Sequence, residues 1–228
     1  MRKLILFDID GTLLMTGGAG KEAFNRVFAE HYGIAGAWRD IHPDGRTDPS
    51  LIVELFEKNL GRRPVPEEMQ RVSSAYAEAF EEALPRSERF RLLPGVVALL
   101  NFLSEREIGL LGLATGNFES TAGQKLRHAG LHGYFRFGGY GSDHVQRVEL
   151  TRIAVERGRA LLGGGWLPNE EIILVGDTLH DIECGRRLGL TTVAVATGST
   201  PRAALEAARP DFVLDSFTPL EEVALVFD

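Results

Sequence analysis

The fold is decided by the stretch Leu4-Ile5-Leu6-Phe7-Asp8-Ile9-Asp10-Gly11-Thr12, where an apolar run ends abruptly in two carboxylates and a glycine. A short apolar run of this kind is typical of a strand buried in a parallel sheet. Ligands of open α/β sheets bind just beyond the carboxyl ends of such strands, which is where Asp8 and Asp10 stand. Two carboxylates so close either share a cation or shift each other's pKa. The sequence therefore predicts a functional site here.

The bulk composition sets the class of protein. The chain has 228 residues, a formal net charge of −7 and a single cysteine, Cys184. This length can bury a large core, in one domain or in a core with an insertion. The acidic balance argues against a nucleic-acid partner, and one cysteine excludes an intramolecular disulfide and a zinc cluster. The N-terminal apolar run ends at Asp8, too short for a signal peptide or a membrane span, so we expect no membrane partner and a cytoplasmic location.

From residue 89 onward, strand and helix patterns alternate, which is typical of βαβ units and of a doubly wound, mostly parallel α/β sheet. The expected strands are Ile108–Ala114, Ile172–Val175, Thr191–Ala196 and Phe212–Leu214. The expected helices are Leu92–Ser104, Ser120–Ala129, Asp181–Leu188 and Val148–Leu162, the last ending at Gly163-Gly164-Gly165. The stretch Gly139-Tyr140-Gly141 lacks the third glycine of a dinucleotide-binding fingerprint, and we interpret it as a loop.

Residues 17–85 differ from the rest, since they show helical periodicity and no convincing strand. The expected helices there are Ala19–His31, Pro49–Leu60 and Pro66–Leu84. A block of helices between the first strand and the remaining α/β pattern is typical of an inserted domain. The predicted division is therefore a core of residues 1–15 and 87–228, with a helical cap of residues 16–86.

Polar groups follow three of the predicted strands. Asp8 and Asp10 follow the first, Thr115-Gly116-Asn117 the second, and Gly176-Asp177-Thr178 the third, with Asp181 four residues beyond Asp177. Because the carboxyl ends of parallel strands meet at one edge of a sheet, these groups are expected to form a hard-cation site beside an oxyanion site.

Two other uses of these residue types are excluded by their spacing. A calcium loop that begins at Asp8 would need a glycine where Leu13 stands and a bidentate Glu where Ala19 stands. A phosphate-binding loop that ends at Gly20-Lys21 would need its first glycine at Met15 and Ser or Thr at Glu22.

The motifs Phe7-Asp8-Ile9-Asp10-Gly11-Thr12-Leu13, Thr115-Gly116-Asn117 and Gly176-Asp177-Thr178-Leu179-His180-Asp181 resemble the first, second and fourth motifs of the haloacid dehalogenase (HAD) superfamily. Their order and strand placement match, and the resemblance spans nearly the whole chain. The helical insert is similar to the C1-type cap of phosphoglycolate phosphatase-like members. The resemblance implies an Mg²⁺-dependent phosphatase that hydrolyses small phosphomonoesters through an aspartyl-phosphate.

The resemblance also implies roles for the motif residues. Asp8 is the nucleophile, and Asp10 is the general acid that later activates water. Mg²⁺ takes the Asp8 side chain, the Asp10 backbone carbonyl and Asp177, while Asp181 holds a metal-bound water or orients a cation. Thr115 is a catalytic residue that hydrogen-bonds the transferring phosphoryl group. The predicted substrate-binding residues are Gly11, Thr12, Arg46, Gly116 and Asn117.

The third motif of the family is a Lys or Arg, and its usual Lys-Pro pair is missing here. No Lys occurs from residue 126 to residue 228. We therefore predict that Arg147, which opens the helix Val148–Leu162, is the catalytic cation, with Arg152 as the alternative. Arg keeps the charge and adds a fork that suits phosphate.

The predicted cap begins with two segments that bear on the substrate. Asp48-Pro49 is interpreted as a helix N-cap followed by Pro at the first helical position, while Arg46 is expected to read the leaving group. The segment Met15-Thr16-Gly17-Gly18 departs from the Asp-Ser common in phosphoglycolate phosphatases, which puts phosphoglycolate itself in doubt.

Two other functions stay open beside the phosphatase. A phosphomutase of the same fold keeps Asp10 and differs in which molecule receives the phosphoryl group. A non-catalytic, metabolite-sensing regulator is the second, although it would not need the pair Asp8 and Asp10. A dehalogenase of the same fold lacks the second Asp of the first motif, so Asp10 argues against that reaction. The expected partner is a small phosphorylated metabolite, and the sequence leaves monomer or homodimer open.

Overall fold

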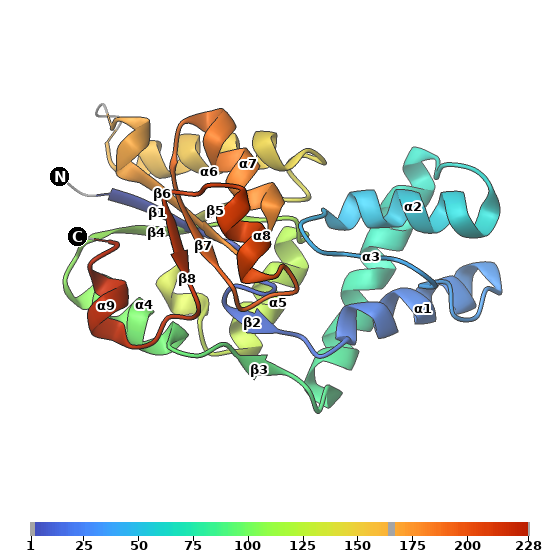
Figure 1. The fold of residues 1–228 in the computed structure, drawn as a ribbon. Coiled ribbons are helices and arrows are strands. Elements are labelled where there is room, and N and C mark those ends of the chain that lie inside the picture. The colour runs from blue at the N-terminus through green and yellow to red at the C-terminus, as the bar shows by residue number, and fades with distance from the viewer. Residues whose placement is uncertain (1–2, 164–166, 228) are drawn as a thin grey trace.

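A six-stranded sheet forms the centre of the larger part of the molecule, as the computed structural model shows for residues 3–163 and 167–227 (Figure 1). Its strands are β1 (Lys3–Phe7), β4 (Gly109–Thr115), β5 (Phe137–Tyr140), β6 (Ile172–Gly176), β7 (Thr191–Val195) and β8 (Phe212–Leu214). They lie in the order β5-β4-β1-β6-β7-β8, and every neighbouring pair is parallel. The predicted fold class is confirmed.

Helices cover both faces of this sheet. They are α4 (Val96–Glu105), α5 (Glu119–His128), α6 (Arg147–Leu161), α7 (Leu179–Leu188), α8 (Arg202–Ala207) and α9 (Leu220–Ala224). Side chains of β1 alternate between two hydrophobic clusters: Ile5 and Phe7 pack with α4, α5 and α9, and Leu4 and Leu6 pack with α6 and α7. A strand buried on both faces explains why its sequence is apolar without interruption. Cys184 lies in the second cluster as a buried packing residue.

The structure corrects two expectations about the elements of the sheet region. Gly139 and Tyr140 belong to the edge strand β5 and not to a loop. The helix expected from Leu92 begins at Val96, because Arg91–Leu92 forms a short strand, β3, which pairs antiparallel with β2 (Leu14–Met15). The run Gly163-Gly164-Gly165, which is expected to end the helix Val148–Leu162, lies mostly outside the described residues.

Three helices, α1 (Ala19–Tyr32), α2 (Asp48–Leu60) and α3 (Pro66–Ala83), form a separate group beside the sheet (Figure 1). We call them the helical insert. They pack through an aromatic centre in which the Phe24 and Tyr76 rings stack with centroids 3.8 Å apart. Short 3-10 helices follow α3 at Leu84–Arg86 and occur at His132–Tyr134 and Asn169–Glu171. The domain boundaries at 15/16 and 86/87 stay a prediction.

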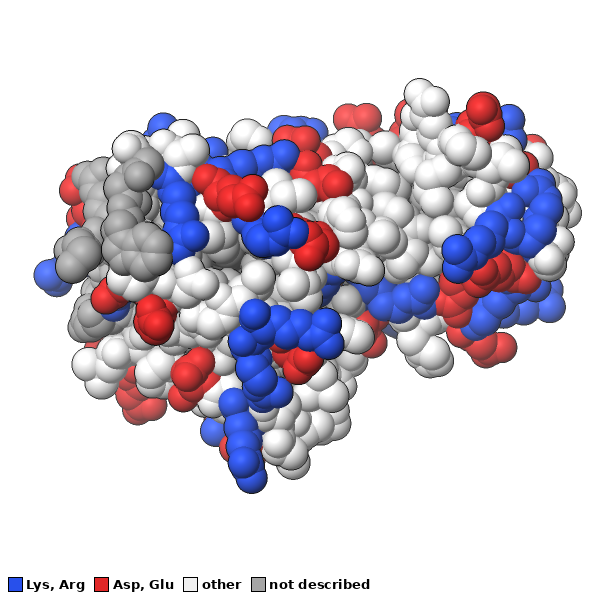
Figure 2. Space-filling model, turned by 90° about the horizontal axis from the view of Figure 1, so that it is seen from above, with Lys and Arg blue, Asp and Glu red and all other residues white. Residues whose placement is uncertain are grey.

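The surface carries charges of both signs. Figure 2 shows Lys and Arg side chains interspersed with Asp and Glu on the face that it displays. Some of them pair within one helical turn, such as Arg187 with Glu183 on α7 and Arg202 with Glu206 on α8. Within residues 3–163 and 167–227, none of the helices has the length and apolarity to cross a membrane.

Candidate active site

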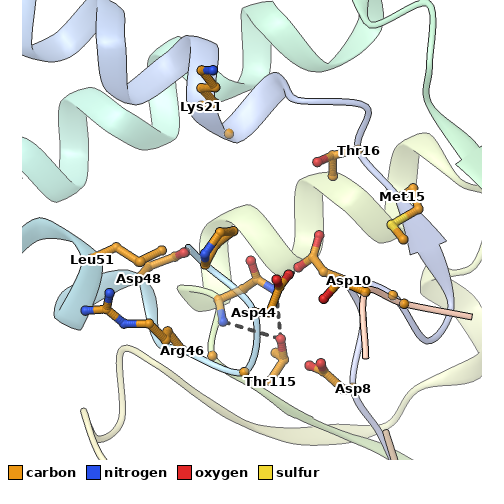
Figure 3. A pocket seen from close by; sticks show the side chains of 18 of the residues that line it. Asp8, Asp10, Met15, Thr16, Lys21, Asp44, Arg46, Asp48, Leu51 and Thr115 are labelled. Carbon is orange, nitrogen blue, oxygen red and sulfur yellow. Dashed lines mark hydrogen bonds between the residues drawn. The ribbon is translucent and has the colours of Figure 1, made fainter. Parts of the chain in front are cut away.

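A cavity of about 420 Å³ lies between the helical insert and the carboxyl ends of β1, β4 and β6. Figure 3 shows Asp8, Asp10 and Thr115 gathered at one end of it, while Lys21 on α1 lies at the other end. The predicted site residues that line the cavity are Asp8, Asp10, Gly11, Arg46, Thr115, Gly116, Asn117, Arg147 and Asp177. Residues from five distant parts of the chain thus meet at one edge of the sheet, where open α/β sheets bind their ligands.

Asp8 stands directly after β1, where its carboxylate is buried against a guanidinium. Arg147, the first residue of α6, places Nη2 3.0 Å from Asp8 Oδ1 and 2.7 Å from Asp181 Oδ1. Burial raises the pKa of Asp8 to about 6 although Arg147 opposes this shift. Burial would lower the pKa of Arg147, but the charges of Asp181 and Asp8 outweigh it and raise that pKa. Arg147 is therefore held as a cation between two carboxylates.

Arg152, the alternative cation, lies elsewhere. Its guanidinium is half exposed on the outer side of α6, where it pairs with Glu149 and Glu156. It does not line the cavity among the described residues. The geometry thus brings Arg147 to Asp8 and leaves Arg152 at the surface.

Asp177 follows β6 and fills a space that only glycine neighbours leave open. A Cβ atom at Gly11, whose φ is +82°, or at Gly198 would collide with its carboxylate. Thr12, predicted to bind substrate, is fully buried and instead donates a hydrogen bond from Oγ1 to Asp177 Oδ1 at 3.2 Å. Burial raises the pKa of Asp177 to about 8, and the charges of Asp8 and Asp181 add to the shift.

These acidic residues fit a divalent cation. Asp8, Asp177 and Asp181 are buried, and each offers a carboxylate oxygen within 4.8 Å of the others. Carboxylate oxygens are the ligands that Mg²⁺ prefers. Arg147 balances only part of the negative charge of these carboxylates, and a dication would offset the rest. Both oxygens of Asp181 already have partners, however. Oδ1 accepts from Arg147, and Oδ2 accepts from Thr178 Oγ1 at 2.6 Å. Asp8 and Asp177 are the freer ligands.

The side chain of Asp10 points to a different set of partners. Its Oδ2 accepts hydrogen bonds from Asn117 Nδ2 at 2.7 Å and from Lys125 Nζ at 2.6 Å. Asn117 also donates from Nδ2 to Thr115 Oγ1 at 2.7 Å and accepts from Lys125 Nζ at 2.5 Å (Figure 3 shows the bonds to Thr115). Asn117, predicted to bind substrate, thus links Asp10, Thr115 and Lys125.

Lys125 is a site residue that the sequence reasoning missed. It lies in the middle of α5, and its side chain is only 5% exposed. Lys125 stands one residue before the stretch 126–228, in which the sequence has no lysine. The signal was its position, because Lys125 shares the buried face of the helix with Ala122 and Leu126. A lysine on an apolar helix face is rarely buried without a partner.

The segment before α2 docks onto the sheet. Thr47 Oγ1 donates to the Val145 carbonyl at 3.0 Å, and the Asp48 backbone N–H donates to the Gly116 carbonyl at 2.7 Å. A Cβ atom at Gly116 would collide with the Arg46 carbonyl, so this approach requires glycine. The insert therefore touches the second predicted motif directly.

Asp48 does not cap its own helix, which corrects the sequence interpretation. Thr47 is the N-cap of α2, and Asp48 and Pro49 are its first two residues. The buried Asp48 carboxylate instead reaches the start of α5, where Oδ2 accepts from the Phe118 backbone N–H at 2.9 Å and from Thr121 Oγ1 at 3.2 Å. An acid of the insert thus supplies a hydrogen-bond acceptor to a helix N-terminus of the core.

The effect of Asp48→Asn on stability should depend on pH. Burial raises the pKa of Asp48 to about 6 from 3.8, although Lys125 opposes the shift. A raised folded-state pKa means that wild-type stability falls between about pH 4 and pH 6 and stays lower above. Asn keeps an acceptor and removes the charge, so the variant should be more stable at pH 7 by up to about 3 kcal/mol. At pH 4 the gap should nearly vanish.

Urea unfolding of both proteins at pH 4, 5, 6 and 7 measures this difference. Asp44→Asn is the matched control, because Asp44 is exposed in the same loop. A difference between wild type and Asp48→Asn that does not change with pH would show that the buried charge is not the cause.

Arg46 lines the cavity, but its guanidinium is engaged on the insert. It pairs with Glu54 and donates from Nη2 to the Ser50 carbonyl at 3.2 Å. Figure 3 shows its side chain turned away from Asp8. The insert also lines the cavity with the apolar and aromatic side chains of Phe24, Trp38, Leu51 and Tyr76 and with the charged Lys21, Asp44 and Asp48. A phosphate fills only part of such a space, so room remains for the rest of a small substrate.

Known proteins match this chain over nearly its whole length. A family model described as haloacid dehalogenase-like hydrolase matches residues 2–189. "Probable phosphatase IndB" of Dickeya dadantii (strain 3937) is 30% identical over 230 residues, covering 96% of this chain and 91% of that protein. The "Phosphoglycolate phosphatase" of Synechococcus elongatus is 27% identical over 214 residues, covering 93% of this chain and 92% of that protein.

A solved structure shares the fold as well. The crystal structure of CbbY from Rhodobacter sphaeroides in complex with phosphate superimposes with a TM-score of 0.76 and covers 96% of each chain at 24% identity. At this identity the similarity concerns the arrangement of sheet and insert alone.

Proposed function

Since this chain belongs to the haloacid dehalogenase-like hydrolase family, we propose that it is an Mg²⁺-dependent phosphatase of small phosphomonoesters that works through an aspartyl-phosphate on Asp8. The observation that carries the proposal is the convergence of Asp8, Asp10, Thr115, Arg147 and Asp177 on one cavity. Two relatives that cover this chain almost completely carry phosphatase names. The substrate is proposed to be a small phosphorylated metabolite, as the cavity volume allows.

Asp8 is the proposed nucleophile. Its carboxylate oxygen attacks phosphorus, and the bond from phosphorus to the ester oxygen breaks. Asp10 gives a proton to the departing oxygen. A water molecule then attacks the aspartyl-phosphate while Asp10 takes its proton, and this step frees phosphate and restores Asp8. Division into two displacements lowers the barrier of a very slow uncatalysed reaction.

Other residues hold the reacting groups. Arg147 lies 3.0 Å from Asp8 and is proposed to balance the charge of the nucleophile and of the phosphate, with Asp181 fixing its orientation. Thr115 and the backbone around Gly116 would hydrogen-bond the phosphoryl oxygens. The Asp8 and Asp177 side chains and the Asp10 backbone carbonyl would hold Mg²⁺. The ion would supply positive charge at the phosphoryl oxygens.

Release of inorganic phosphate from purified protein tests the proposal. We expect hydrolysis of p-nitrophenyl phosphate and of several phosphorylated metabolites with Mg²⁺ present, and a loss of at least about 100-fold with EDTA, since a divalent ion supplies several kcal/mol of charge stabilisation. Added Mg²⁺ in excess of EDTA should restore the rate. Equal rates with and without EDTA would contradict the metal requirement. No phosphate release from any ester would contradict the phosphatase.

The same assay separates the phosphatase from its rivals. A phosphomutase would need a bisphosphate activator and would return the phosphoryl group to a sugar, so free phosphate would not accumulate in proportion to substrate consumed. A metabolite-sensing regulator would bind esters without turnover. Stoichiometric release of phosphate without an activator is the outcome that we expect.

A further inference from the structure

Lys125 carries a buried charge whose partners come from two catalytic motifs and from the insert. Its Nζ donates to Asp10 Oδ2 at 2.6 Å and to Asn117 Oδ1 at 2.5 Å. It also lies 5.5 Å from the centroid of the Phe80 ring on α3, within cation–π range. A buried ammonium is costly unless such partners are present, so the position of Lys125 is strongly fixed.

This contact fixes the orientation of the Asn117 amide. Because Asn117 Oδ1 accepts from Lys125, its Nδ2 must face the other way, where it donates to Asp10 Oδ2 at 2.7 Å and to Thr115 Oγ1 at 2.7 Å. An Asn without such a partner could turn its oxygen toward Asp10, and the two oxygens would repel each other. Lys125 therefore acts on Asp10 twice, by a direct ion pair and through the amide.

The carboxylate of Asp10 needs this support because it is 43% exposed and stands in a turn beyond β1. Both bonds found for it among the described residues end on Oδ2, on the side of α5. Oδ1 is thus left for the cavity that Asp10 lines. A group that must exchange a proton with a leaving oxygen and then with water gains from a fixed position, since an error of about 1 Å can cost roughly 100-fold in rate.

We propose that Lys125 is a positioning residue for Asp10, which it aims at the leaving oxygen directly and through Asn117. This proposal rests on the proposed phosphatase. It also connects the insert to the reaction, because Phe80 packs over the ammonium and Asp48 holds the first turn of the helix that carries Lys125. Docking of the insert completes the environment in which Lys125 holds Asp10.

A double-mutant cycle tests the proposal. The variants are Lys125→Met, which keeps most of the length of the side chain without its charge, Asp10→Asn, and the two combined. We expect Asp10→Asn to lose roughly 10²–10⁴-fold in kcat and Lys125→Met to lose roughly 10²-fold. The double variant should be no slower than Asp10→Asn within about twofold, because Lys125 acts through a group already removed. Losses that multiply would overturn the proposal.

Substrate dependence gives a readout that a purely structural role would not change. Phenyl phosphate has a poorer leaving group than p-nitrophenyl phosphate and depends more on a proton donor. Lys125→Met should therefore lower kcat more for phenyl phosphate, with KM nearly unchanged. A raised KM with unchanged kcat would make Lys125 a substrate-binding residue and contradict the proposal. Lys58→Met is the matched control, because Lys58 is an exposed lysine on α2 whose loss should leave kcat unchanged.

Wild-type activity separates the two proposals. An inactive wild type would refute the phosphatase itself, whereas an active wild type with a multiplicative cycle refutes only the role of Lys125. Lys125→Gln is the second variant if Lys125→Met does not fold, as judged by circular dichroism. Failure of both variants to fold would assign Lys125 to the stability of the fold and overturn the positioning role.

Discussion

Asp8→Asn is expected to lower phosphate release on the order of 10⁶-fold, as for other enzymes that lose their covalent nucleophile. The amide nitrogen cannot attack phosphorus, and no neighbouring carboxylate can take its place. Asp10 is held by Asn117 and Lys125 on the side of α5, and Asp181 is bound by Arg147 and Thr178. Asp177 accepts from Thr12 and is the proposed metal ligand, so it would not be available as a nucleophile. Trapping with acid should likewise detect phosphorylated protein in wild type and none in the variant.

The same substitution should leave the fold intact. Burial raises the pKa of Asp8 to about 6 even with Arg147 beside it, so the ionised carboxylate opposes folding at pH 7. A neutral side chain of equal shape removes this opposition, and Arg147 keeps Asp181 as its partner. We therefore expect the melting temperature of Asp8→Asn, measured at pH 7 in EDTA, to equal or exceed that of wild type.

The control for Asp8→Asn is Asp211→Asn. Asp211 accepts hydrogen bonds from the Thr192 backbone N–H and hydroxyl just before β8 begins, at the edge of the sheet opposite the cavity. Its loss should leave the rate unchanged. Substantial phosphate release by Asp8→Asn, above contamination by host phosphatases, would refute the nucleophile assignment.

Arg147→Met should lower both activity and stability, in contrast to Asp8→Asn. The change leaves Asp8 and Asp181 buried without their shared cation, and breaking a buried pair typically costs about 3–5 kcal/mol of unfolding free energy. Activity should fall by at least about 10³-fold, the scale on which loss of one preorganised charge-stabilising group acts. Urea unfolding in EDTA at pH 7 and kcat in Mg²⁺ measure the two effects.

Arg152→Met is the matched variant on the same helix. Its guanidinium is half exposed, and surface ion pairs contribute about 0–1 kcal/mol. We expect its stability to change by less than about 1 kcal/mol and its rate to stay the same. The opposite order of the two arginines, in rate or in stability, would exchange their assignments.

The family and the α/β fold could be predicted because their signals are local. The motif at Asp8 and Asp10 is continuous in sequence, and the match to haloacid dehalogenase-like hydrolases confirms the family and that the chain is a hydrolase. The strand β5 was missed because Phe137-Gly138-Gly139-Tyr140 contains two glycines, which disfavour a strand. Pairing with β4 and close packing on α6 outweigh that preference.

The missed parts of the site depend on tertiary contacts. Thr and Asp are both favoured as N-caps, so the sequence could not decide between Thr47 and Asp48 at the start of α2. The true partner of Asp48 lies 70 residues away, at Phe118. Lys125 likewise has its ion-pair partner, Asp10, 115 residues away. Propensity rules describe residues that are close in the chain, so they cannot predict contacts between residues so far apart in sequence.

The antiparallel pair of β2 and β3 affects how the segment inserted between them can change in evolution. The chain leaves the sheet at Leu14–Met15 and returns at Arg91–Leu92, and these segments pair with each other. A second tie, from Ser87 Oγ to the Thr16 carbonyl at 2.7 Å, lies just outside that pair. Everything between the two crossings can be lengthened, shortened or exchanged without disturbing the order of the sheet strands. Selection can thus alter which molecules are accepted, provided that the contacts of Asp48 with the start of α5 and of Phe80 with Lys125 are kept.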